Sequence, residues 1–61
     1  MLVQIINKTD LQQFVNIGMS RDANDSISIP ARGKVIVNLE NEKLFIDISK
    51  KSRNKLILKK L

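Results

Sequence analysis

The chain has 61 residues, and 11 Lys and Arg against 6 Asp and Glu give it a formal net charge of +5. A core this small seldom supplies more than about 3–5 kcal/mol of stability, so we expect a partner to share the stabilisation. The chain has neither Cys nor His, which excludes disulfides, thiolate metal sites and the usual proton shuttle near neutral pH. These counts argue against an enzyme, a bound cofactor and a zinc site.

Targeting signals are not evident. Residues 1–6 lack the basic start and the long apolar run of a signal peptide, and no stretch reaches the ~18–20 apolar residues that span a bilayer. We therefore expect one domain over residues 1–61, no membrane partner, and a location in a cytoplasm or in a particle assembled there.

Short apolar runs, rich in Ile and Val and bounded by turn-forming residues, indicate strands. In chain order they predict six strands, near residues 2–6, 12–17, 26–29, 34–39, 44–48 and 55–60. Several of these runs are apolar on both faces, which one small sheet cannot bury. We therefore predict an all-β fold, a small antiparallel β-sandwich or β-barrel of about six short strands.

The longest polar connection is residues 18–25, which we expect to be the most mobile loop. Within it, Asp22, Asn24 and Asp25 carry oxygens at spacings that resemble the start of a calcium-binding loop. The central Gly and the distal Glu of such a loop are missing. The sequence therefore predicts a polar loop that binds no metal.

The third strand alternates cleanly as Ser26-Ile27-Ser28-Ile29, and a turn follows it. Pro30 removes a ladder donor there, and Gly33 can take a positive φ. These two residues predict that the chain turns or changes sheet between residues 30 and 33.

The next two strands, 34–39 and 44–48, read as a hairpin that turns at residues 40–43. In this register Val37 and Ile46 are buried cross-strand neighbours on one apolar face. A helix over 39–51 is the competing interpretation, because Leu44 and Ile48 lie four residues apart. The apolar positions 45, 46 and 48 together make no clean helical stripe, which favours the hairpin.

A second hairpin is predicted with residues 49–55 as its connection, which sets Leu56 beside Ile48 and Leu58 beside Ile46. It holds the basic residues that we select as candidate contacts for a partner or for nucleic acid: Lys50, Lys51, Arg53, Lys55, Lys59 and Lys60. Such a cluster can contact phosphates, or it can be a solvated turn whose lysines protect an edge strand. The only aromatic residues are Phe14 and Phe45, outside the basic segment, so base stacking is disfavoured.

Hydroxyl nucleophiles are present without a base to activate them. A Ser–Lys pair would need a buried Lys, and every Lys lies in or beside a polar stretch. We therefore expect no catalytic residues among the hydroxyl candidates, which are Thr9, Ser20, Ser26, Ser28, Ser49 and Ser52.

Three segments resemble the small β-sandwich accessory proteins of tailed bacteriophage particles. They are residues 7–9, residues 14–18, and residues 25–37 with the Pro30-Ala31-Arg32-Gly33 corner between two strands after an acidic loop. The resemblance covers roughly residues 3–39. It implies a structural protein docked on a capsid or tail, and it implies no particular binding residues.

Two hypotheses follow. The first is a non-enzymatic virion subunit, assembled in the host cytoplasm, that docks through β-edge and apolar-face contacts onto copies of itself or a larger shell or tail protein. The second is a small, basic, cytoplasmic regulator that binds nucleic acid. Apolar docking survives high salt, whereas phosphate binding weakens steeply with it.

Overall fold

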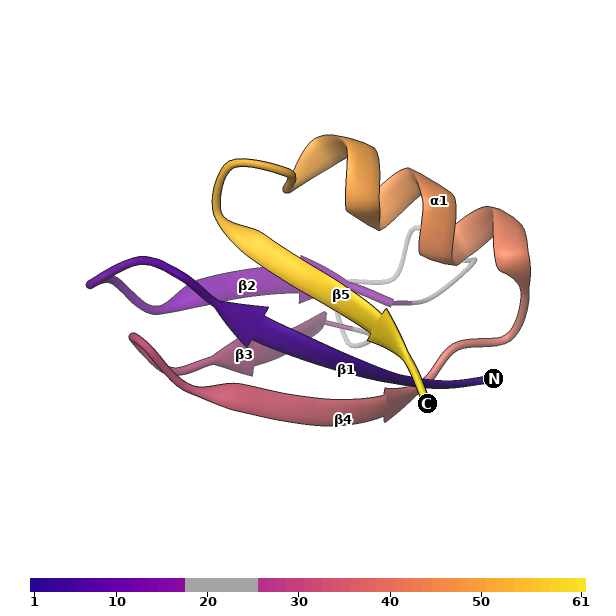
Figure 1. The fold of residues 1–61 in the computed structure, drawn as a ribbon, viewed down its shortest axis with the longest axis horizontal. Coiled ribbons are helices and arrows are strands. Elements are labelled where there is room, and N and C mark those ends of the chain that lie inside the picture. The colour runs from indigo at the N-terminus through magenta and orange to yellow at the C-terminus, as the bar shows by residue number, and fades with distance from the viewer. Residues whose placement is uncertain (18–25) are drawn as a thin grey trace.

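The computed structural model describes residues 1–17 and 26–61. Its elements are β1 (Leu2–Asn7), β2 (Gln13–Asn16), β3 (Ser26–Ile29), β4 (Lys34–Asn38), α1 (Glu42–Lys51) and β5 (Leu56–Lys60). Strands β4, β1 and β5 form one antiparallel sheet in that order, and β2 and β3 form a second (Figure 1). The predicted antiparallel β-rich fold is confirmed, although the strands of the described residues do not close into a barrel. Residues 18–25, expected to be a mobile loop, lie outside the described residues.

Strand β1 is the centre of the larger sheet because it is apolar on both of its faces. Its register pairs Ile5 with Val35 of β4 and with Leu58 of β5. Val3 and Ile5 face inward and are fully buried, while Leu2 and Ile6 face the other way. Alternation along β1 therefore divides the sheet into a buried inner face and an outer face.

The predicted strand over 44–48 is wrong, because these residues belong to α1. The side chain of Asn41 caps the helix by accepting a hydrogen bond from the backbone N–H of Leu44 at 2.9 Å. Leu44 and Ile48, one helical turn apart, are both buried against the core. The competing interpretation of a helix within 39–51 is the one the structure bears out.

Both predicted hairpins are also wrong, because each of them included the strand predicted over residues 44–48. Val37 pairs with Val3 of β1 rather than with Ile46, which is 41% exposed on α1. Leu56 and Leu58 pair with β1 as well, instead of lying beside Ile48 and Ile46. Strand β1 thus lies between β4 and β5 and pairs with both, the place that was predicted for residues 44–48.

The turn between β3 and β4 forms where it was predicted, with the N–H of Gly33 donating to the carbonyl of Pro30 at 2.9 Å. The positive φ lies at Arg32 (58°), not at Gly33. Gly33 is required for a different reason, because a Cβ at this position would lie 2.6 Å from Pro30 Cγ. The turn therefore depends on a close approach at Gly33 and on a left-handed backbone at Arg32.

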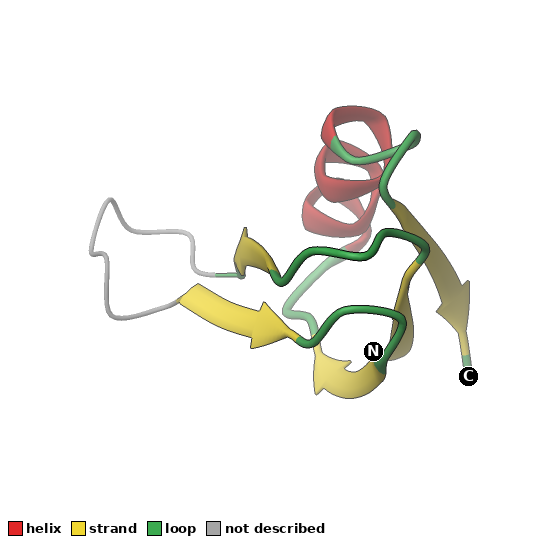
Figure 2. Ribbon diagram, turned by 90° about the vertical axis from the view of Figure 1, so that its left-hand side faces the viewer, coloured by secondary structure: helices red, strands yellow, loops and turns green. Residues whose placement is uncertain are grey.

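The core lies between the inner face of the three-stranded sheet and the elements on that side of it, α1 and the β2–β3 hairpin (Figure 2). Asn7, at the end of β1, is a polar residue buried in this core and is only 1% exposed. Leu39, in the connection before α1, is also buried. Within residues 1–17 and 26–61, the buried apolar residues are Val3, Ile5, Val15, Ile29, Leu39, Leu44, Ile48 and Leu56.

Candidate docking surfaces

The outward side of the three-stranded sheet carries an apolar patch that no described element covers. The strand register assigns alternate residues to this side, and Leu61 continues the alternation after β5, its N–H donating to the carbonyl of Leu2 at 2.9 Å. We call this surface the outer face. Its residues are Leu2, Gln4, Ile6, Lys34, Ile36, Asn38, Ile57, Lys59 and Leu61.

The outer face combines aliphatic side chains with positive charge. Ile36 is 61% exposed and Leu2 is 53% exposed, which is unusual for large aliphatic residues in neighbouring positions of one sheet. Lys34 and Lys59 are its charged side chains, and none of the described residues assigned to the face has an acidic side chain. Its chemistry fits a partner surface with an apolar centre and carboxylates at its rim.

Self-association through the outer face is opposed by this charge. Two copies packed face to face would bring Lys34 and Lys59 of each copy into one interface without an acidic side chain of the face to pair with them. The face therefore fits a different protein better than a second copy of this chain.

Four of the six candidate basic residues gather at one end of α1. Lys50 and Lys51 form its last turn, Arg53 and Lys55 follow in the turn over 52–55, and all four are exposed. The turn is fixed by the N–H of Leu56, which donates to the carbonyl of Ser52 at 2.7 Å. We call these four residues the basic end.

The other two basic candidates lie elsewhere, on opposite sides of β5. Lys59 belongs to the outer face, whereas Lys60 turns toward the first turn of α1. There the ammonium of Lys60 lies 2.5 Å from Glu42 Oε1 and 5.0 Å from the centre of the Phe45 ring. The six residues selected from the sequence do not form one patch.

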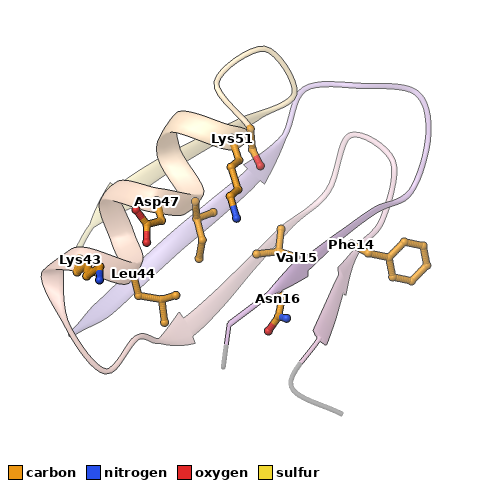
Figure 3. Close-up of a pocket in the computed structure, with 9 residues that line it drawn as sticks. Phe14, Val15, Asn16, Lys43, Leu44, Asp47 and Lys51 are labelled. Carbon is orange, nitrogen blue, oxygen red and sulfur yellow. The ribbon is translucent and has the colours of Figure 1, made fainter. Parts of the chain in front are cut away.

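A groove of about 470 Å³ separates β2 from α1 (Figure 3). On the helix side it is bordered by Lys43, Asp47 and Lys51, four residues apart on one face of α1. We call this feature the β2–α1 groove. Its lining residues are Phe14, Val15, Asn16, Lys43, Leu44, Asp47, Ile48, Lys51 and Ser52.

Sequence reasoning missed the groove because it placed a strand where α1 lies. A helical reading of residues 42–51 would have aligned Lys43, Asp47 and Lys51 through their four-residue spacing. The opposite wall, β2, was predicted near its observed position. The groove was therefore missed because residues 44–48, which lie within α1, were predicted as a strand instead of a helix.

The hydroxyl candidates of the described residues take structural or surface positions. Thr9 hydrogen-bonds to the Asn7 side chain, and Ser26 and Ser28 are exposed on β3. The calcium candidates Asp22, Asn24 and Asp25, and also Ser20, lie outside the described residues. Within residues 1–17 and 26–61, no three carboxylate side chains come together as a metal-binding group.

Comparison with protein-family models, with curated proteins and with solved structures gives no match for this chain. The resemblance of residues 3–39 to phage accessory proteins therefore gains no support from relatives. In the described part of the chain, no helix is long and apolar enough to cross a bilayer.

Proposed function

We propose that this chain is a non-enzymatic structural subunit of a phage particle, an accessory or decoration protein of the capsid or tail. In this proposal it docks onto a larger shell or tail protein through its outer face. The observation that carries the proposal is the set of exposed aliphatic side chains on one side of a sheet whose other side is buried.

Backbone edges add to this docking surface. Strands β4 and β5 are the outermost strands of the sheet, and each pairs with β1 alone among the described strands. Their free edges border the outer face, so a partner can contact side chains and unpaired backbone groups together. These edges support the docking through β-edge and apolar-face contacts that we propose.

The sandwich form belongs to the same proposal. It is supported by the shared core, in which Val15 and Ile29 of the smaller sheet pack with Val3 and Ile5 of the larger one. The placement in a virion is supported by the resemblance of residues 3–39. A partner that covers the outer face would also add apolar burial to a small core.

Photo-crosslinking from the outer face tests the proposal. An Ile36→Cys variant carrying a thiol-linked photo-crosslinker is produced in the native source, and the crosslinked partner is identified by mass spectrometry. Ser28→Cys, on exposed β3, is the matched control. We expect Ile36→Cys, and not Ser28→Cys, to crosslink to one larger capsid or tail protein.

Three results would overturn the proposal: no crosslink from position 36, equal crosslinks from both positions, or a partner that is not a particle protein. A crosslink only between copies of the chain would reject the larger partner and indicate a homo-oligomer.

The second candidate function is nucleic-acid binding. The observation that favours it is the basic end, where four exposed cations stand together at the end of α1. We rank it below docking because neither aromatic residue lies in the basic end. Phe45 packs beside Lys60 and Phe14 lies on β2.

A further inference from the structure

The β2–α1 groove runs along the edge of β2 that faces away from β3. It touches Phe14, Val15 and Asn16, three consecutive residues of the strand. Because consecutive side chains of a strand point to opposite faces, a groove that meets all three lies against the edge of the strand and not against one face. Among the described strands, β2 pairs only with β3, so no described strand pairs with its other edge.

The opposite wall of the groove is a row of charges with a defined spacing. Lys43, Asp47 and Lys51 follow each other at four-residue intervals along α1. With a rise of about 1.5 Å per residue, neighbouring charges stand about 6 Å apart and the two lysines about 12 Å apart. In the described residues, none of the three takes part in an ion pair, since those found are Arg32 with Asp10 and Lys60 with Glu42.

An extended chain matches this spacing. Residues two apart in a strand lie about 6.6 Å apart on the same side, and residues four apart lie about 13 Å apart. A strand lying in the groove can therefore set residues i, i+2 and i+4 opposite Lys43, Asp47 and Lys51 in turn. Charge complementarity requires an acidic residue at i, a basic residue at i+2 and an acidic residue at i+4.

The intervening residues of such a strand meet Phe14. This side chain is 69% exposed and points away from α1, while Val15 is buried on the opposite side of β2 (Figure 3). Positions i+1 and i+3 of an added strand would lie on the same side as Phe14, where cross-strand contact with an aromatic ring favours apolar residues.

We propose that the β2–α1 groove binds an extended acidic segment of a partner protein, which adds to β2 as a further strand. The segment has the pattern acidic, apolar, basic, apolar, acidic. The groove shares no residue with the outer face. This inference therefore stands or falls independently of the proposed function.

The test uses a capped peptide, Thr-Glu-Val-Lys-Val-Glu-Thr, titrated into the full chain labelled with nitrogen-15. A peptide of identical composition, Thr-Glu-Glu-Val-Lys-Val-Thr, is the control, because its acidic residues are adjacent. We expect the first peptide to shift the amide signals of Phe14, Val15 and Asn16 and to slow their hydrogen exchange. The control peptide should bind at least about threefold more weakly, the scale of one partly exposed ion pair.

Charge reversals on α1 make the test specific. Lys43→Glu and Lys51→Glu should each raise Kd by about threefold or more, whereas Lys50→Glu, one residue from the groove wall, should change it by less than about 1.5-fold. In the triple variant Lys43→Glu, Asp47→Lys and Lys51→Glu, which reverses all three charges of the groove wall, a peptide with Lys and Glu exchanged should recover binding. Circular dichroism of each variant checks that α1 is intact.

Several outcomes would overturn the proposal. Equal loss in Lys50→Glu, or equal binding of both peptides, would indicate general attraction to a basic protein. Shifts confined to the outer face would place the peptide elsewhere. A single-stranded oligonucleotide that produced the same shifts at β2 more strongly than the peptide would identify the groove as a nucleic-acid site.

Discussion

The side-chain oxygen of Asn7 accepts two hydrogen bonds from Thr9, one from its backbone N–H at 2.9 Å and one from its hydroxyl at 2.7 Å. The amide nitrogen of Asn7 donates to the carbonyls of Leu11, Ile29 and Pro30 at 2.8 to 3.1 Å. One buried side chain thus connects the end of β1 to the loop that follows it and to the end of β3.

Replacing this donor is the first prediction. Asn7→Asp keeps the shape of the side chain but sets a carboxylate oxygen against three carbonyl oxygens. We expect the free energy of unfolding to fall by about 2–4 kcal/mol, the cost of a buried polar group without its partners. Urea denaturation measures it, with exposed Asn54→Asp as the control. A loss below about 1 kcal/mol would show that the network is dispensable.

The turn after β3 yields the second prediction. Gly33→Ala places a methyl group against Pro30 Cγ and the Pro30 carbonyl oxygen, which lie 2.6 and 3.1 Å from the Cβ position. We expect it to cost about 1–3 kcal/mol, because the ring or the backbone must move.

Arg32→Asn is the matched substitution in the same turn. Asn tolerates the φ of 58° at this position better than Arg does, and the lost ion pair with Asp10 is highly exposed. Thermal unfolding should show Arg32→Asn within about 0.5 kcal/mol of the unmodified chain. The account of Gly33 fails if the two variants lose equal stability.

Two isoleucines of α1 provide the third prediction. Ile48 is 5% exposed and Ile46 is 41% exposed, although the same atoms are removed when either becomes Ala. We expect Ile48→Ala to cost about 2–4 kcal/mol and Ile46→Ala less than about 1 kcal/mol. The midpoints of urea denaturation measure the difference in stability between the two variants, provided that their m-values are equal. A larger loss at Ile46 would favour the strand predicted from the sequence.

The fourth prediction concerns the basic end. Changing Lys50, Lys51, Arg53 and Lys55 together to Gln should leave the unfolding midpoint nearly unchanged, because the four side chains are exposed. The docking proposal expects negligible binding of duplex DNA before and after the change.

Titration with duplex DNA at two salt concentrations checks this. If the unmodified chain binds DNA tightly and the four substitutions flatten the dependence of log K on log salt by up to about 3.6, nucleic-acid binding replaces docking as the function.

The type of most elements could be predicted from residue patterns. Alternation and bounding turn residues placed β1, β3, β4 and β5 within a residue or two of their observed bounds. The segment around α1 failed because Leu44 and Ile48 fit a helix while Phe45 and Ile46 also suit a strand. The deciding signal was polar: Asn41 as a cap, with acidic Glu42 in the first turn.

Strand pairing was harder to predict than strand position. Neighbours in sequence were assumed to pair, whereas β1 pairs with β4 and β5, both distant from it along the chain. The two-sided apolarity of residues 2–6 is the feature that suits a central strand. The basic candidates were predicted as one cluster, but Lys59 and Lys60 are consecutive residues of a strand. Their side chains therefore point to opposite sides of β5.

The central place of β1 also governs the order in which the chain can fold. Residues 2–7 are synthesised before the other described strands, yet they stay without one neighbour until residues 56–60, their partners across the sheet, have been made. Pairings this distant along the chain form slowly, while α1 closes through local contacts. During synthesis, a strand that is apolar on both faces therefore stays partly uncovered until β5 has been made, and a nascent chain with exposed apolar strands is prone to aggregate.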